Sequence, residues 1–385
     1  MAATSGTSAS SSGAASAAAA AAAPLPATYR RGEAAVLGGP GALRLAELPL
    51  APPARGEVLL RVLATDATYT DLLILAGNYP GVPTSPAVPG YACAALVAAV
   101  GADAAHAFNV GDAVLAMPQH GCAAEFLALP ARLCIKVADA AGAAFVRARP
   151  EIAASLALTG VTAHQMLHRV AGAARLRAPD ASVLVTAAAG GTGAMLVQLA
   201  KLAGVVPARI VGTCSRKNLE AVTALGATAI CYEDADWATQ ARAATGGSGF
   251  CAAFDSVALE NFGRCVSLLA PGGAYVAYGF TSKASPGSMS LPAVVPFFAQ
   301  LSFRHSVLHG VFGAADASFY VVSSRRDEHP DEYAEDLLAL TALAAGGRLE
   351  VVVGAVHEFH EVKAALQGIA AGRHRGKQCI LVSRP

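Results

Sequence analysis

A short turn of small residues separates two apolar runs of different pattern near the middle of the chain. Val183 to Thr186 is apolar and partly β-branched, as a buried parallel strand requires, whereas the residues from Ala194 onward favour a helix. The turn between them has Ala188 followed by Gly190, Gly191, Thr192 and Gly193. Glycine lets an anion approach the backbone, and the first N–H groups of a helix bind anions. The spacing is that of a dinucleotide-binding turn with alanine in first place, although glycine in such a turn can also serve packing alone.

The residues after the next apolar run, Ala208 to Thr213, indicate which dinucleotide would bind. An acidic residue at this place holds the ribose 2′-hydroxyl of NAD. No carboxylate occurs here; the chain has Ser215, Arg216 and Lys217, which can bind a 2′-phosphate instead. NADPH is therefore the predicted cofactor.

Length and composition restrict the remaining classes of protein. With 385 residues, 54% hydrophobic and 14% charged, the chain predicts a globular protein of two domains. A net charge of +1 gives no basis for nucleic-acid binding. No uninterrupted apolar stretch reaches the roughly 20 residues that cross a bilayer, so we expect no integral membrane protein. The eight cysteines include no C-x-x-C pair, so we expect neither a disulfide framework nor a structural zinc site.

The first 28 residues are of low complexity, rich in alanine and serine, and we expect them to be disordered. They resemble an organelle transit peptide in lacking acidic residues, but they also lack its interspersed arginines. The scattered cysteines favour a reducing compartment. We therefore expect a cytoplasmic protein, with the mitochondrion or the plastid as the alternative if these residues are a transit peptide.

The elements that would position the turn form two groups. Residues 29–137 read as β-rich, with strands predicted at Glu57 to Leu63, Ala94 to Val100, Ala113 to Ala116 and Glu125 to Leu129, and no helix between them. Two helices follow, at Glu151 to Leu158 and Ala163 to Val170. Strands and helices then alternate, with strands at Val183, Ile210, Ala229 to Tyr232, Cys251 to Asp255 and Ala274 to Tyr278. Such alternation predicts an α/β fold with a doubly wound parallel sheet.

The tail reads as a return to the first group: a strand at Leu349 to Val353, a helix at Glu361 to Ile369 and a strand at Gln378 to Val382. We therefore predict a disordered segment at 1–28, a substrate domain at 29–159, an NADPH-binding domain at 160–320 and a return to the substrate domain at 321–385.

A series of motifs now gives the chain a family resemblance. In order, they are Thr68 to Pro80, Pro89-Gly90, Val110-Gly-Asp112, Gly121 to Phe126, Thr159 to Ala163 and Ala187 to Gly193. The chain resembles the medium-chain dehydrogenase/reductase superfamily, in its zinc-independent quinone oxidoreductase branch, over nearly everything after residue 29. Within that branch it is most similar to the prostaglandin reductases, which reduce the enone of 15-oxo-prostaglandins with NADPH. The resemblance implies a Rossmann domain inserted in a GroES-like domain.

The resemblance also assigns cofactor contacts. It places Gly190 to Gly193 at the pyrophosphate and Ser215 with Arg216 or Lys217 at the 2′-phosphate, although Leu219 stands near where the family has a further lysine. The remaining cofactor contacts that it implies are Tyr232 near the adenosine, Ser256 at a strand end, Thr162, Gly279 and Phe280 near the nicotinamide, and Phe312 and Lys377 closing over the cofactor.

Zinc-dependent members of this superfamily carry metal ligands at positions that read Tyr69 and Tyr91-Ala92 here. A tetrahedral site cannot be built from those residues, and His120 beside Cys122 reads as a loop coincidence. We therefore expect no metal. Hydride transfer to an enone or a quinone needs none, because the conjugated carbonyl accepts the charge as an enolate, which the protein must position and stabilise.

Tyr79 is the predicted catalytic residue, since the resemblance places it facing the nicotinamide and a phenol can donate a hydrogen bond to an enolate. The alternative is that Tyr79 packs the pocket wall. Asp71 is expected to be a structural hydrogen-bond acceptor, His164 a helix-surface or packing residue, and Tyr278 a core residue. Thr68 stands where the family often has asparagine.

The segment after Gly279 is expected to recognise the substrate, with Met289, Phe297 and Phe298 either facing an apolar ligand or packing the core. The resemblance implies a homodimer joined through edge strands near Phe303 to Phe312. The predicted substrate is a small-molecule enone, such as an oxo-lipid. A quinone reductase, or a cofactor-binding protein without important turnover, are the alternatives.

Overall fold

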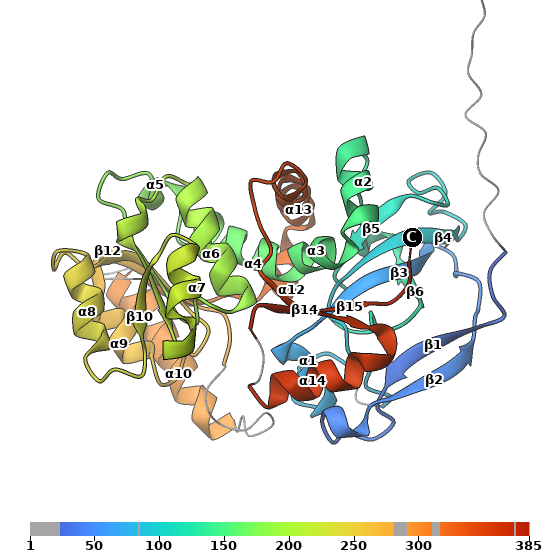
Figure 1. The fold of residues 1–385 in the computed structure, drawn as a ribbon, viewed down its shortest axis with the longest axis horizontal. Coiled ribbons are helices and arrows are strands. Elements are labelled where there is room, and N and C mark those ends of the chain that lie inside the picture. Colours follow the sequence, from blue (N-terminus) through green and yellow to red (C-terminus); the bar gives the residue numbers. More distant parts are fainter. Residues whose placement is uncertain (1–23, 84, 281–290, 310–315, 373–374, 385) are drawn as a thin grey trace, which may run out of the picture.

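The computed structural model describes residues 24–384 apart from 84, 281–290, 310–315 and 373–374. It contains two large sheets, which stand at opposite ends of the molecule with helices α3, α4, α12 and α13 between them (Figure 1). The predicted α/β class is confirmed. The last residue of the segment predicted to be disordered, Thr28, already belongs to a strand, because it pairs with Pro49.

One end of the molecule is the β-rich half, which comprises strands β1–β7, β14 and β15. Strands β1 (Thr28–Glu33) and β2 (Arg44–Pro49) form an antiparallel pair. The main sheet has the order β14-β15-β3-β4-β5-β7, with β6 also paired to β3. Its strands are β3 (Glu57–Ala67), β4 (Cys93–Val100), β5 (Ala113–Ala116), β6 (Phe126–Pro130), β7 (Cys134–Lys136), β14 (Val353–Glu358) and β15 (Lys377–Leu381). The tail therefore returns to the first sheet, as predicted.

The strand predicted at Leu349 to Val353 was wrong. Leu349 and Val351 are buried, but strand pairing begins only at Val353 and runs to Glu358. Apolar residues before the strand fill the core without joining the ladder, and alternation alone cannot separate those two uses.

The other end is the parallel-sheet half, which has the strand order β10-β9-β8-β11-β12-β13, all parallel. The strands are β8 (Val183–Val185), β9 (Ile210–Cys214), β10 (Thr228–Cys231), β11 (Phe250–Asp255), β12 (Leu269–Ala277) and β13 (Asp316–Phe319). Val183 to Val185 are fully buried, as expected of a central strand covered on both faces. The strand order reverses between β8 and β11, and ligands bind at the carboxyl ends of strands flanking such a point.

The α-helices are α1 (Tyr69–Leu75), α2 (Ala140–Ala148), α3 (Pro150–Ser155), α4 (Val161–Gln165), α5 (Ala173–Leu176), α6 (Gly191–Leu202), α7 (Leu219–Ala224), α8 (Trp237–Ala244), α9 (Phe262–Ser267), α10 (Leu291–Phe303), α12 (Val322–Glu328), α13 (Pro330–Ala345) and α14 (Val362–Ala370). Segments of π-helix, η3 (Leu156–Gly160), η4 (Met166–Val170) and η7 (Arg304–His309), continue α3, α4 and α10. Among the residues described, no helix combines the length and the apolar character needed to cross a bilayer.

Two expectations about helices were wrong. Helix α1 lies within the stretch predicted to be purely β-rich, and a capping box formed by Thr68 and Asp71 begins it. The region predicted to supply an edge strand for dimerisation is helical from Phe303 to His309, and the edge strand is β13 instead.

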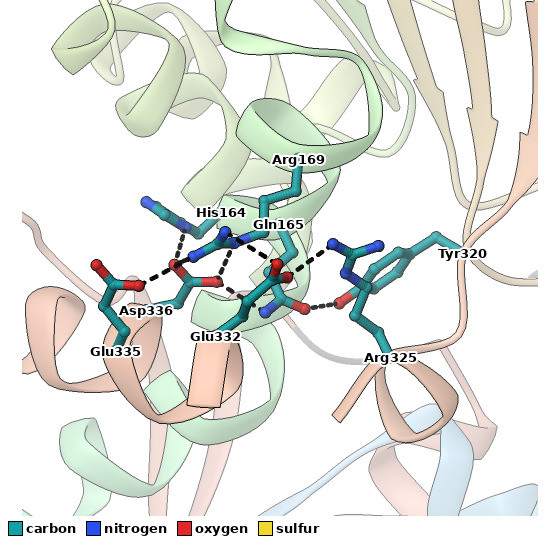
Figure 2. A network of polar contacts seen from close by, with 8 residues as sticks. All are labelled: His164, Gln165, Arg169, Tyr320, Arg325, Glu332, Glu335 and Asp336. Atoms are coloured by element: carbon teal, nitrogen blue, oxygen red, sulfur yellow. Dashed lines mark hydrogen bonds and ion pairs between the residues drawn. The ribbon is translucent and has the colours of Figure 1, made fainter. Parts of the chain in front are cut away.

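A polar network joins the helices at the centre of the molecule (Figure 2). Asp336 of α13 accepts hydrogen bonds from Arg169 at 2.7 and 2.8 Å and from Gln165 of α4 at 2.7 Å. Gln165 in turn accepts a 2.7 Å bond from Tyr320, which directly follows β13. His164 lies beside Asp336, with 3.4 Å between Nδ1 and Oδ1. The network therefore ties the segment that leads into the parallel sheet to the segment that leaves it.

The charge of Asp336 is what the network stabilises. Burial would raise the pKa of this carboxyl, but hydrogen bonds from His164, Arg169 and Gln165 together outweigh burial and hold the pKa well below its ordinary value of 3.8. A carboxyl with a lowered folded-state pKa stabilises the fold above its unfolded pKa, and the stabilisation is lost as the pH falls.

We therefore expect Asp336→Asn to lower the free energy of unfolding by about 2 kcal/mol at neutral pH, between the values typical of exposed and of buried ion pairs. The loss relative to wild type should shrink on acidification below pH 3.8. Thermal unfolding followed across pH checks this. Glu335→Gln is the control, because Glu335 is 78% exposed and contacts Arg169 at 3.5 Å. Equal melting temperatures for the two variants would contradict the role of Asp336.

Candidate active site

The glycine turn lies at the carboxyl end of β8, where α6 begins. Gly190 is the N-cap of α6 and Gly191 its first residue. A Cβ atom on Gly193 would overlap the carbonyl oxygen of Ala187, and one on Gly191 would come within 2.6 Å of the Cδ atom of Lys377. Ala187 itself has a φ of 49°. The helix therefore approaches the turn too closely for a side chain at these glycines, and no side-chain hydrogen bond caps its start in the described part of the chain.

Three neighbouring strands place polar groups next to this turn. Thr186, after β8, donates a 2.7 Å hydrogen bond to Asp255 at the end of β11 and accepts a 3.1 Å bond from the backbone N–H of Ser256. The phenol of Tyr278, after β12, contacts Ser256, and a Cβ on Gly279 would lie 3.0 Å from the Ser256 carbonyl. The structure thus brings the predicted residues Ser256 and Gly279 together at the strand ends.

A cavity of about 580 Å³ lies beyond the end of β9. Its lining contains all four residues predicted to bind the adenosine and its 2′-phosphate; the full lining is Ser215, Arg216, Lys217, Asn218, Tyr232, Glu233 and Gly372. Arg216 is exposed and pairs with Asp234 at 2.5 Å. Asn218 donates a 3.1 Å bond to Ser215. The cavity therefore has two cationic side chains and several neutral hydrogen-bonding groups at one mouth.

Lys377, at the start of β15, reaches the glycine turn from the β-rich half. Its side chain is buried and its Nζ lies 2.5 Å from Oδ2 of Asp66 in β3. Asp66 also accepts a 2.8 Å bond from Ser155 of α3. The aliphatic part of Lys377 fills the space that glycine leaves at position 191. The ion pair thus holds Lys377 against the turn.

The predicted catalytic residue, Tyr79, is half-buried and its hydroxyl lies 2.7 Å from that of Tyr91. The rings meet edge to face, with centroids 5.7 Å apart. Tyr91 follows Gly90, whose N–H donates a 2.7 Å bond to Asp71. Asp71 is also close enough to Lys377 for its positive charge to favour the ionised carboxylate.

Asp71 is a fully buried structural acceptor, as expected. It accepts hydrogen bonds from Gly90 and from both the N–H and the hydroxyl of Thr68. Burial raises its pKa to about 6 despite those bonds. The carboxyl fixes the loop that carries Tyr91 to the start of α1.

The structure places the remaining predicted residues as follows. Thr162 is buried in α4, which packs against α6. Phe280 stacks on Phe319 at 4.9 Å and also meets Phe297 and Phe298, so these rings form one aromatic cluster. Phe297 is buried in that cluster while Phe298 is 40% exposed. Phe312 and Met289 lie outside the described residues.

Sequence reasoning missed several neighbours of the site. Asn218 and Glu233 directly follow predicted residues and could have been included with the same two loops. Tyr91 was considered only as a position without a metal ligand. Asp66 and Gly372 had no signal, because their proximity to the site depends on how the tail packs across the molecule.

The overlap at Gly193 predicts that Gly193→Ala lowers the free energy of unfolding by about 2–3 kcal/mol, since the backbone of Ala187 cannot yield as a side chain can. Gly263→Ala in α9 is the control: its Cβ meets open space, so stability should stay equal or rise by up to about 1 kcal/mol. Thermal or denaturant unfolding measures both, and an unchanged midpoint for Gly193→Ala would contradict the close approach.

Two family models match the sequence: the alcohol dehydrogenase GroES-like domain at residues 54–144 and zinc-binding dehydrogenase at residues 191–324. The synaptic vesicle membrane protein VAT-1 homolog-like of Mus musculus is 31% identical over 245 residues, which are 64% of this chain and 55% of that protein. The chloroplast envelope quinone oxidoreductase homolog of Arabidopsis thaliana is 36% identical over 197 residues, 49% of this chain and 56% of that protein. The chain spans about half the length of these relatives.

Among solved structures, mycobacterial Rv1454c complexed with NADPH is 26% identical, with a TM-score of 0.71 over 92% of this chain and 100% of that chain. The human VAT-1 homolog-like protein, 24% identical, has the same fold, with a TM-score of 0.71 over 94% of this chain and 100% of that chain. The two family models together match more than half of the sequence. The chain therefore belongs to the medium-chain dehydrogenase/reductase superfamily, whose members join a GroES-like domain to a parallel-sheet Rossmann domain.

Proposed function

We propose that this protein is an NADPH-dependent, zinc-independent reductase of the activated double bond of enones. The observation that carries the proposal is the cavity beyond β9, whose lining combines Ser215, Arg216 and Lys217 with Tyr232. Two cations and a hydroxyl beside an aromatic ring suit a phosphorylated adenosine, whereas Glu233 is the only carboxylate in that lining. The mycobacterial relative complexed with NADPH supports the same cofactor.

The rest of the site fits the cofactor along its length. Gly190 to Gly193 would hold the pyrophosphate, because the space that a Cβ would need is taken by backbone and by Lys377. Thr162 in α4, Ser256 directly after β11 and Gly279 just after β12 would line the cofactor, with Thr162 and Gly279 toward the nicotinamide. Phe280, Phe312 and Lys377 complete the predicted set. Bound there, a reduced nicotinamide supplies a hydride to an electron-poor carbon.

The chain itself would bind and orient the substrate and stabilise the charge that develops on its carbonyl oxygen. Tyr79 is the proposed donor to that oxygen, because its side chain is only half-buried and its hydroxyl is already held by a second phenol. Positions Tyr69 and Tyr91 carry phenols rather than metal ligands, so the proposed chemistry uses no zinc. The proposal of zinc-independent chemistry is made for this chain alone, although the family model that it matches is described as zinc-binding dehydrogenase.

The proposed substrate class is an enone, with 15-oxo-prostaglandin-like oxo-lipids as the finer proposal. The exposed Phe298 in the aromatic cluster suits an apolar ligand. A quinone is the second candidate, and relatives named quinone oxidoreductase support it. The enoyl reductase of known structure, 21% identical, shows the fold alone.

We also propose a homodimer, a cytoplasmic location, with the mitochondrion or the plastid as the alternative, and domain limits at 29–159, 160–320 and 321–385. These remain predictions from the sequence.

The first test follows NADPH oxidation by the purified protein with a simple enone, a 15-oxo-prostaglandin and a quinone, with products identified by mass spectrometry. Reduction of the enone double bond is the expected result. Turnover of the quinone alone would replace the proposal by quinone reduction. Tight NADPH binding without turnover of any of the three would leave a cofactor-binding protein.

The cavity predicts cofactor preference. Arg216→Ala should weaken NADPH binding about 10-fold and leave NADH binding unchanged, because it removes a charge-assisted hydrogen bond from an exposed site. Arg209→Ala is the control, since Arg209 directly precedes β9, at the end of that strand opposite to the cavity, and donates a hydrogen bond to the carbonyl of Asp180. Cofactor titration by fluorescence measures both. Equal losses for NADPH and NADH would contradict a 2′-phosphate site.

The proposed catalytic role of Tyr79 predicts the behaviour of the variant Tyr79→Phe. The variant should bind NADPH as the wild type does but lower kcat with the enone by about 100-fold, since a hydrogen bond formed in the transition state is lost. Steady-state kinetics with separate cofactor titration measures this. Full activity would mean that Tyr79 only packs the pocket wall.

A further inference from the structure

Tyr79 does not stand alone: its hydroxyl is backed by Tyr91, one of the most deeply buried large side chains among the described residues, at 1% exposed. The distance of 2.7 Å between the two hydroxyl oxygens is a full-strength hydrogen bond. Either oxygen can act as the donor. The direction of this bond decides whether the proton of Tyr79 is free for a substrate.

The far side of Tyr91 settles that direction. Its phenol also contacts the hydroxyl of Ser323 at the start of α12, and the positive charge of Arg326 acts on it. Ser323 and Arg326 are both buried. Arg326 is fixed in turn by Asp327 at 2.6 and 2.8 Å and by the carbonyl of Met117. A positive charge favours hydroxyl protons that point away from it, toward Tyr79.

The protonation of Tyr91 agrees with this direction. Burial, more than the neighbouring Tyr79, raises the pKa of Tyr91 well above its ordinary value, while Ser323 and Arg326 oppose the rise. Tyr91 therefore stays protonated at every working pH and has one proton to give. The charge of Arg326 therefore favours the arrangement in which Tyr91 donates its hydrogen bond to Tyr79, with the oxygen of Tyr91 facing Ser323 and Arg326.

We propose that Tyr91 is a positioning residue for Tyr79. A directed chain of hydrogen bonds runs from Ser323 to Tyr91 to Tyr79, and it leaves the Tyr79 proton as the free end that faces the substrate oxygen. No proton leaves either phenol: the chain donates hydrogen bonds and carries no net charge. This inference rests on the proposed function, because it assigns the hydroxyl of Tyr79 to the developing enolate.

The chain also strengthens the donor. Hydrogen bonds that share a direction polarise one another, and each bond gains roughly a tenth to three tenths in strength. Arg326 at the buried end draws electron density away from the substrate end as negative charge builds up there. Tyr79 is thus a better donor with Tyr91 behind it than a phenol backed by carbon.

The test compares Tyr91→Phe with Tyr333→Phe in the full chain. Tyr333 is also buried, and its hydroxyl makes a single 2.7 Å bond to the carbonyl of Ala157. Tyr91→Phe loses the contacts with Tyr79 and Ser323, Tyr333→Phe loses the single bond to Ala157, and both variants should therefore lose thermal stability. Only Tyr91→Phe should lower kcat with the enone, by about 10-fold, with the Kd for NADPH unchanged. Ser323→Ala should lower kcat less, in the same direction.

A spectroscopic readout separates donation from structure. With NADP⁺ in place of NADPH, a bound enone is not reduced, and the infrared carbonyl frequency reports the hydrogen bond that it accepts. We expect the downward shift of this frequency to be reduced in Tyr91→Phe, abolished in Tyr79→Phe and unchanged in Tyr333→Phe. The double variant Tyr79→Phe/Tyr91→Phe should be no slower than Tyr79→Phe alone.

The failures are distinguishable. If the wild type binds the enone without reducing it, the proposed function fails, while the carbonyl frequency still reports the hydrogen bond from Tyr79 and the effect of Tyr91 on it. If Tyr79→Phe slows reduction but Tyr91→Phe behaves like Tyr333→Phe in both rate and frequency, this inference alone is overturned. No enone signal in the wild type would overturn both.

Discussion

The close approach of α6 to the turn before it is the constraint on which the site depends. Because Gly193 lies against the backbone of Ala187, the helix starts just after β8, the strand beside which the strand order of the sheet reverses. The neighbouring strand ends then bring Thr186, Asp255 and Ser256 into contact. A side chain at Gly193 would push α6 away from the turn and would change the contacts that the residues around the turn make.

Two buried polar systems that differ in kind support the contact between the two halves. Near the turn, Lys377 and Asp66 form a single ion pair within the β-rich half, with almost no exposure of either side chain, and it holds Lys377 against Gly191 of the parallel-sheet half. Around Asp336, several donors share one carboxylate, and one of them, Arg169, remains partly exposed. The first is a rigid point contact, because an unpaired charge there would be strongly disfavoured. In the second, Gln165 and Arg169 both donate to the carboxylate of Asp336, so the loss of one donor leaves the other.

Patterns in the sequence predicted the elements that repeat and missed those that depend on tertiary contacts. Ala113 to Ala116 was predicted to the residue, and the parallel strands β8 to β12 were found within a few residues, since a buried strand needs an apolar run bounded by turns. Strand β13 (Asp316–Phe319) was not predicted. Helix α1 was missed because it is short and owes its start to the capping box of Asp71 rather than to periodicity. In the site, residue types and their position after an apolar run singled out the residues after β9, which line one cavity. The contact of Tyr79 with Tyr91 could not, since it depends on how two loops pack.

Gly372 gives the cavity beyond β9 a property that the other lining residues do not. It follows α14, in the β-rich half, whereas Ser215 to Asn218, Tyr232 and Glu233 belong to the parallel-sheet half. A ligand that fills the cavity therefore touches both halves at once and binds best in the arrangement that brings them together. By thermodynamic linkage, such a ligand stabilises that arrangement by as much as the arrangement favours the ligand. The occupant of this cavity would then serve as a structural part of the joint between the halves as well as a reactant.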